Sequence, residues 1–152
     1  MAELVQEKTS DWDCDVTILD GRDPDAAHQK RAAFKAADVA LAASGTVSLE
    51  LAAAATPMVI AYDMAWLTRQ IISRMLLVDT VTLVNLVSDT RVVPEFIGQN
   101  CQPALIAQGI ETVLRVPQAQ IDAMQSTMTR LGQGGEAPGL RAARAVLDGL
   151  SD

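Results

Sequence analysis

Residues 39–62 read VALAASGTVSLELAAAATPMVIAY, and this stretch decides the fold. Its two apolar runs, 39–43 and 58–62, lack the polar–apolar alternation of a half-exposed strand, so both predict buried strands of a parallel sheet. The alanine- and leucine-rich segment between them, 47–55, predicts a helix that ends before Pro57. A strand, a helix and a second strand in this order indicate an α/β protein.

The same alternation continues on both sides of this unit. Short apolar runs at 16–19 and 81–84 predict two further strands. The other expected elements are helices over residues 2–8, 26–37, 65–78, 103–115, 118–131 and 139–150, a short helix that starts at Pro94, and a loop at 132–135. We therefore expect one domain over residues 1–152, with an α/β part at about 15–95 and a helical tail at about 96–152.

Composition excludes several classes of protein. Apolar residues make up 49% of the chain and charged residues 20%, which excludes a disordered chain. A net charge of −7 and 3% aromatic residues argue against nucleic acid as a partner. Cys14, Cys101 and the single histidine, His28, are too few for a zinc site or a disulfide framework. The sequence predicts no signal peptide and no apolar run long enough to span a membrane.

The loop Ser44-Gly45-Thr46 follows the first buried strand and precedes a helix. Ligands of parallel α/β sheets bind at the carboxyl ends of the strands, and the amides at a helix start bind phosphate. Glu50 lies four residues after Thr46, on the same helical face, where its carboxylate could accept hydrogen bonds from ribose hydroxyls. From these residues alone the commoner alternative stays open, an ordinary helix cap beside a solvated Glu50.

Four segments along the chain form a wider pattern. They read ADVALAASGTVSLE at 37–50, TPMVIAY at 56–62, TLVNL at 82–86 and RVVPEF at 91–96. In this order and spacing they resemble the C-terminal half of lipid-A-disaccharide synthases, and the resemblance covers about residues 15–150. The Ser-Gly-Thr-x-x-Leu-Glu motif by itself is shared more loosely with other nucleotide-sugar glycosyltransferases built from two Rossmann-like domains (GT-B).

The resemblance implies a reaction and a partial Rossmann-like sheet. Such enzymes transfer 2,3-diacylglucosamine from its UDP derivative to 2,3-diacylglucosamine 1-phosphate, without metal or cofactor, and make the lipid A disaccharide in the cytoplasm, peripherally on the inner membrane. The C-terminal half holds UDP. By motif, Ser44, Gly45 and Thr46 would face the diphosphate and Glu50 the ribose. Asn85 and Arg91 would line the same cleft.

The resemblance also implies that parts of the enzyme are missing. Its catalytic residues belong to an N-terminal half that this sequence lacks, so we expect the chain to be a fragment that binds UDP weakly and catalyses nothing alone. Val84 stands where the family usually has proline, and Asp63 where it usually has a basic residue. These departures favour an alternative, a non-catalytic remnant or interaction module of the same fold. Another UDP-sugar enzyme is a further alternative.

A sheet without its first strands leaves an open edge. In the usual strand order, 16–19 would have no neighbour and 39–43 would expose an apolar edge, which invites pairing. We therefore expect 16–19 to move beside 39–43, or the chain to form a homodimer through that edge.

The expected helix at 65–78 has one apolar half and one polar half. Trp66 and Leu77 fall among its polar residues, beside Arg69 and Arg74. An exposed tryptophan with two arginines suits an anionic lipid surface. The alternative is an ordinary amphipathic helix that packs on the sheet.

Overall fold

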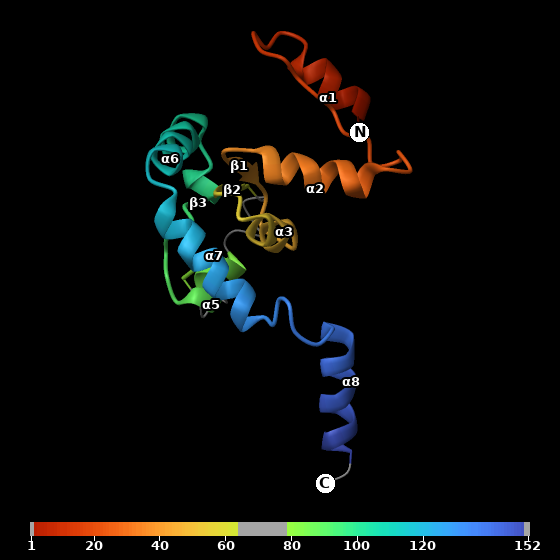
Figure 1. Cartoon of the computed structure of the whole chain (residues 1–152). Coiled ribbons are helices and arrows are strands. Elements are labelled where there is room, and N and C mark those ends of the chain that lie inside the picture. Colours follow the sequence, from red (N-terminus) through yellow and green to blue (C-terminus); the bar gives the residue numbers. More distant parts are fainter. Residues whose placement is uncertain (1, 64–78, 151–152) are drawn as a thin grey trace. The chain divides into compact units, whose positions relative to one another are not determined.

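The computed structural model describes residues 2–63 and 79–150, which form two units divided after Ala37. The first unit contains α1 (Ala2–Thr9) and α2 (Ala26–Ala36). The second unit contains β1 (Ala40–Ala42), α3 (Val47–Ala54), β2 (Met58–Tyr62), α5 (Leu83–Ser88), β3 (Glu95–Ile97), the 3-10 helix η1 (Gly98–Asn100), α6 (Pro103–Arg115), α7 (Gln118–Arg130) and α8 (Pro138–Gly149) (Figure 1).

The second unit is built on a parallel sheet with the strand order β1-β2-β3. Ala40 lies opposite Met58, and Ile60 lies opposite Glu95. The central strand is buried where it carries Met58, Val59 and Ile60. The α/β class and the unbroken apolar pattern of the central strand are therefore confirmed.

Helices cover both faces of this sheet. α6 packs against β2, whereas α7 packs against α3 and α5. Successive residues of a strand point to opposite faces, so the side chains of Glu95 and Phe96 lie on opposite faces of the sheet. Phe96 lies against α6, and Glu95 contacts the segment that leads into α5.

Gly109 lies where α6 meets the ring of Phe96. A Cβ atom at residue 109 would lie 2.5 Å from Cε2 and 2.8 Å from Cζ of that ring. Alanine gains about 1 kcal/mol of helix propensity over glycine, but such overpacking costs more. We expect Gly109→Ala to lower the free energy of unfolding by about 1–2 kcal/mol in urea titrations. Adding Phe96→Leu should restore most of the lost free energy of unfolding. A Gly109→Ala chain more stable than the parent would contradict this packing.

The prediction of a strand at 16–19 is wrong. These residues have no regular secondary structure, and Val16 and Leu19 remain about 40% exposed. β-Branched residues favour strands only where a half-buried sheet surface receives them. The sheet of the described residues ends at β1, so 16–19 does not move beside 39–43, and dimerisation through this edge stays a prediction.

Two predictions near residue 90 are also wrong. Residues 83–88 form α5 instead of a strand at 81–84, and Pro94 precedes β3 instead of a short helix. A run of four apolar residues cannot distinguish a buried strand from a buried helical turn. Proline lacks an amide hydrogen, which suits the start of an edge strand as well as a helix, and here the Pro94 carbonyl accepts from Ile60 N at 2.9 Å.

The other predicted helices are confirmed within one or two residues, as is the loop at 132–135. The helical tail begins after β3 and not at residue 96. The predicted helix 65–78, with Trp66, Arg69, Arg74 and Leu77, lies outside the described residues. Within the described ranges, no helix has the length and apolar character needed to cross a membrane.

Candidate functional site

The loop Ser44-Gly45-Thr46 joins β1 to α3 at the carboxyl end of the strand. Gly45 has a φ of +142°, a conformation that residues with a Cβ rarely adopt. No atom lies within 4 Å of a Cβ built on Gly45, so the backbone conformation and not crowding requires glycine. Gly45 and Thr46 are exposed and Ser44 is half-buried, which leaves the loop accessible to a ligand.

The start of α3 follows this loop directly. Its hydrogen bonds begin with Ser48 N donating to Gly45 O at 3.2 Å and Leu49 N donating to Thr46 O at 3.1 Å. The amides that precede them have no acceptor within a helix and can donate to an anion. Glu50 N donates to Thr46 O at 3.3 Å, so the exposed Glu50 lies one turn beyond the loop, as its spacing predicts.

The hydroxyls of Ser44 and Ser48 hold the loop through hydrogen bonds to backbone carbonyls. The buried Ser48 donates through Oγ to Gly45 O at 2.8 Å. Ser44 donates through Oγ to the carbonyl oxygen of Val81 at 3.3 Å. The second contact joins the loop to a segment 37 residues further along the chain.

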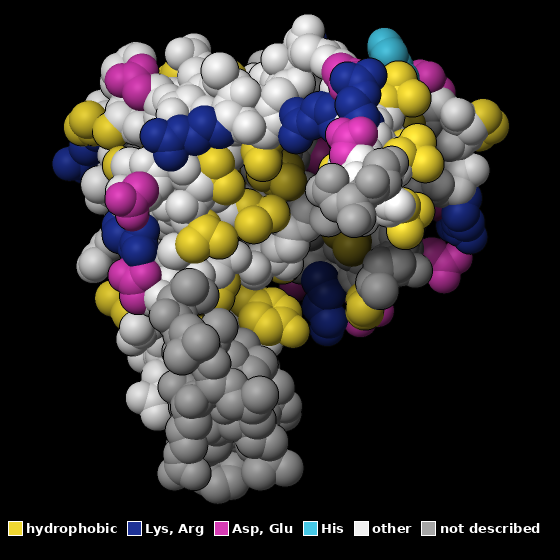
Figure 2. Space-filling model, turned by 90° about the horizontal axis from the view of Figure 1, so that it is seen from below, with side chains coloured by type: hydrophobic (Ala, Val, Ile, Leu, Met, Phe, Trp, Pro, Cys, Tyr) yellow, Lys and Arg dark blue, Asp and Glu magenta, His cyan; other side chains and the backbone are white. Residues whose placement is uncertain are grey.

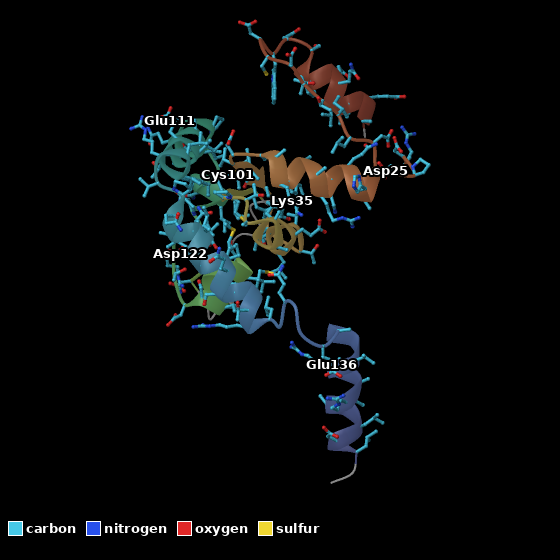
Figure 3. The ribbon with its side chains drawn as sticks, viewed as in Figure 1. Asp25, Lys35, Cys101, Glu111, Asp122 and Glu136 are labelled. Carbon is cyan, nitrogen blue, oxygen red and sulfur yellow. The ribbon has the colours of Figure 1, made fainter. Side chains whose placement is uncertain are left out.

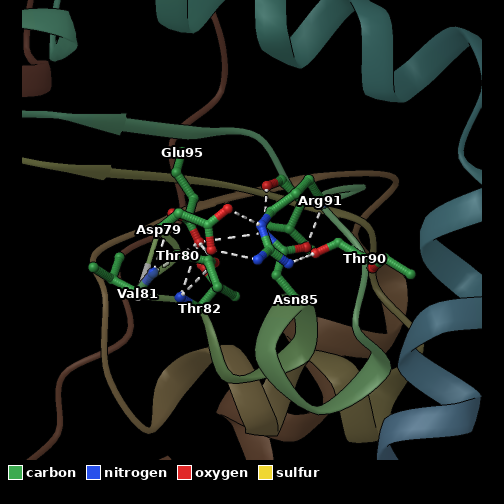
Figure 4. Close-up of polar contacts among 9 residues, drawn as sticks. Asp79, Thr80, Val81, Thr82, Asn85, Thr90, Arg91 and Glu95 are labelled. Atoms are coloured by element: carbon green, nitrogen blue, oxygen red, sulfur yellow. Dashed lines mark hydrogen bonds and ion pairs between the residues drawn. The ribbon is translucent and has the colours of Figure 1, made fainter. Parts of the chain in front are cut away.

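That segment, residues 80–82, is held by the carboxylate of Glu95 (Figure 4). The hydroxyl of Thr80 donates to Oε1 at 2.5 Å and the Thr82 amide donates to the same oxygen at 2.9 Å. The Val81 amide donates to both oxygens, at 3.3 Å to Oε1 and 3.2 Å to Oε2. Glu95 projects from a strand of the sheet, so these contacts fix the segment against a rigid element.

Glu95 carries a negative charge in this position. Burial raises the pKa of its carboxyl, but the hydrogen bonds from Thr80 and from the backbone amides of Val81 and Thr82 lower it more. The resulting pKa lies below the ordinary value, so the group is ionised at neutral pH and accepts from every donor that faces it.

Asn85 does not line an open cleft. It is buried, and its Nδ2 donates to Val93 O at 2.9 Å and to Glu95 Oε1 at 3.2 Å. Its Oδ1 accepts from Val93 N at 3.0 Å. The amide thus closes the loop between α5 and β3 and braces Glu95. Val84, which stands where the family usually has proline, is fully buried beside it.

Arg91 lies on the loop that Asn85 closes. Its guanidinium forms an ion pair with Asp79, with Nε donating to Oδ2 at 3.0 Å. These hydrogen bonds hold the pKa of Asp79 below its usual range. Both side chains are exposed, so the pair can exchange with solvent or with an anion.

The predicted site residues therefore fall into two groups. The first group lies around the start of α3 and contains Ser44, Gly45, Thr46 and Glu50. Asn85 and Arg91 lie around the Glu95 network, and the Ser44–Val81 contact connects the groups. Sequence reasoning missed Glu95; its signal was a lone acidic residue between Pro94 and an apolar pair.

Within the described residues, no three histidine, cysteine or acidic side chains gather as metal ligands. Cys14 is exposed, and Cys101, between η1 and α6, is half-buried; both are free thiols (Figure 3). On the face shown in Figure 2, Lys and Arg side chains lie among Asp and Glu side chains.

A parallel βαβ unit with a glycine loop at the carboxyl end of its first strand defines the class, a partial Rossmann-like α/β domain. The chain matches the family described as lipid-A-disaccharide synthetase over residues 13–144, and it belongs to this family.

Named relatives agree with the family. The chain is 58% identical to the lipid-A-disaccharide synthase of Ruegeria pomeroyi over 99% of its own length and 38% of the relative. It is 41% identical to that of Rhodospirillum centenum, over 97% of this chain and 36% of the relative. It is 38% identical to that of Paramagnetospirillum magneticum, over 97% of this chain and 38% of the relative. The chain thus spans little more than a third of the relatives' length.

Proposed function

We propose that this chain is the UDP-binding part of a glycosyltransferase that makes the lipid A disaccharide. The donor would be UDP-2,3-diacylglucosamine and the acceptor 2,3-diacylglucosamine 1-phosphate. Ser44, Gly45 and Thr46 would bind the diphosphate, and Glu50 would accept hydrogen bonds from the ribose. No residue of this chain is assigned to the chemical step, and neither a metal nor a cofactor is required.

One observation carries the proposal: the exposed glycine loop with a positive φ lies directly before α3, and Glu50 lies one turn beyond it. Amides at the start of a helix bind phosphate groups, and a carboxylate one turn away is placed to meet a sugar hydroxyl. Membership of the family supports UDP as the proposed nucleotide. Arg91 would contribute to phosphate binding by exchanging Asp79 for the ligand.

The proposal predicts weak binding of UDP by the 152-residue chain, with a Kd on the order of 1 mM. Titration of UDP into the ¹⁵N-labelled chain should shift the amide signals of residues 44–50 first. Pyrophosphate should shift the amide signals of residues 44–46. Uridine alone should shift none of the amide signals of residues 44–50 strongly. Gly45→Ala should weaken UDP binding by about fivefold to 150-fold, because alanine must bear about 1–3 kcal/mol of strain to hold the loop at this φ.

A second candidate is a non-catalytic module of the same fold. Asp63, an exposed acid that follows β2, favours it, because an acid near the loop would repel a diphosphate. A well-dispersed spectrum that does not respond to millimolar UDP would favour this module and overturn the donor-site proposal.

Two further expectations belong to the same proposal. The complete enzyme would work in the cytoplasm at the surface of the inner membrane, where its lipid substrates lie. The free edge of β1, where Leu41 is 55% exposed, is the surface for a homodimer.

A further inference from the structure

We propose that Glu95 is a positioning residue for the nucleotide loop, acting through the peptide of Val81 on Ser44. The inference rests on the UDP site proposed above and assigns a role to a residue that does not itself contact the nucleotide. Three steps lead from the carboxylate to the loop.

The first step is the hold of Glu95 on residues 80–82. Its two oxygens accept from one hydroxyl and two backbone amides, so both ends of this short segment are fixed. Thr80 and Thr82 are buried, which shields these hydrogen bonds from water. Glu95 lies in register with the buried Ile60 of the central strand, so the acceptor stands on a strand that pairs with the buried centre of the sheet.

The second step passes through a single residue. The amide of Val81 donates to Glu95, and the carbonyl of the same residue accepts from Ser44 Oγ. The Thr82 amide, which shares one planar peptide group with the Val81 carbonyl, also donates to Glu95, so a rotation of this group that breaks the contact with Glu95 moves the acceptor of Ser44. Glu95 therefore holds the acceptor that anchors Ser44, and with it the loop whose backbone amides would face the ligand, although Ser44 follows β1 and Glu95 begins β3.

The third step explains why a carboxylate stands at residue 95. Asn85 adds a further donor at 3.2 Å, so the group faces only donors from the segment and from α5. Glutamine has the same size but offers one oxygen and turns an amide donor toward the Val81 amide. It should keep the packing and the contacts that Oε1 accepts, and lose the 3.2 Å hydrogen bond from the Val81 amide to Oε2.

A double-mutant cycle on UDP binding tests the proposal in the complete 152-residue chain. We expect Glu95→Gln to weaken UDP binding about fivefold and Ser44→Ala about tenfold. The double variant should bind within twofold of Ser44→Ala, because the effect of Glu95 runs through the Ser44 hydroxyl. A further fivefold loss in the Ser44→Ala background would overturn the proposal.

A matched control separates positioning from a general loss of stability. Val113→Ala removes buried apolar volume on α6, which packs on the other face of the sheet. It should lower the unfolding midpoint about as much as Glu95→Gln does and leave the UDP Kd within twofold of the parent. An equal weakening by both variants would show a merely structural role for Glu95.

A ligand-free measurement keeps the two proposals distinguishable. Without UDP, Glu95→Gln should shift the amide signals of residues 44–46, and Val113→Ala should not. Thr80→Val removes the hydroxyl that donates to Glu95 at 2.5 Å and accepts from the Thr82 amide at 3.4 Å, and leaves the carboxylate in place. It should shift the same signals less and serves if Glu95→Gln unfolds. If the parent fails to bind UDP but these shifts appear, the nucleotide site is wrong and the connection is right. Unmoved signals overturn the connection.

Discussion

Asn85→Leu should lower the free energy of unfolding by about 3 kcal/mol, because buried polar groups that lose their partners each cost about 1–3 kcal/mol. The variant keeps a side chain of similar size and removes three hydrogen bonds. The amide and carbonyl of Val93, a residue only 1% exposed, both lose their partner. Glu95 loses one of its donors. Urea denaturation followed by circular dichroism measures the change.

Asn100→Leu is the matched control, since Asn100 is the other asparagine of the chain and is exposed at the end of η1. The same replacement there should change stability by less than about 0.5 kcal/mol, as surface substitutions usually do. If Asn85→Leu proved as mild as Asn100→Leu, the loop between α5 and β3 would not depend on this amide.

The parts of the fold that the sequence predicts are those decided by neighbouring residues. The run 58–62 coincides with β2 because its first three residues, Met58, Val59 and Ile60, are buried on both faces of the sheet and so leave no polar position. The loop before α3 follows from one glycine and the helix after it. Glu50 follows from the spacing of that helix, since an i, i+4 pair shares a face in any helix.

The parts that fail depend on contacts between distant residues. Whether 81–84 is a strand or the start of a helix is decided by Glu95, which accepts the amides of Val81 and Thr82 from 13 or 14 residues away. Residues 16–19 have strand propensity but no sheet surface in the described chain on which to pack. Propensity describes what a segment can become, and the partner decides the outcome.

The candidate site divides in the same way. Motif resemblance assigned Asn85 to the cleft, but its side-chain amide is fully engaged with Val93 and Glu95. A motif residue can thus be characteristic of a family because it holds a loop and not because it binds a ligand. Glu95 gave little signal in the sequence, because an acid next to apolar residues becomes informative only when its donors are known.

Gln120→Met should also lower the free energy of unfolding by about 3 kcal/mol, because it leaves two buried backbone groups without partners. Gln120 is 3% exposed, and its Oε1 accepts from Met58 N at 2.8 Å while Nε2 donates to Met58 O at 2.9 Å. β3 pairs with the central strand only from Ile60 onward. At Met58, the Gln120 side-chain amide therefore supplies the two hydrogen bonds that a neighbouring strand would otherwise make. Gln125→Met, at an exposed position of α7, is the control and should be nearly neutral.

Gln120→Glu tests the donor half of this contact by its pH dependence. An ionised carboxylate can accept from Met58 N but repels Met58 O, so burial beside a carbonyl raises the pKa of the new group in the folded chain. The destabilisation that ionisation of the new carboxyl group adds should be absent below about pH 4.3, the pKa of glutamate in the unfolded chain. It should grow as the pH rises from there toward the higher pKa of the folded chain. Urea midpoints of Gln120→Glu and the parent, compared from pH 4 to 8, measure this. A pH-independent difference would show that the donation to Met58 O does not stabilise the sheet edge.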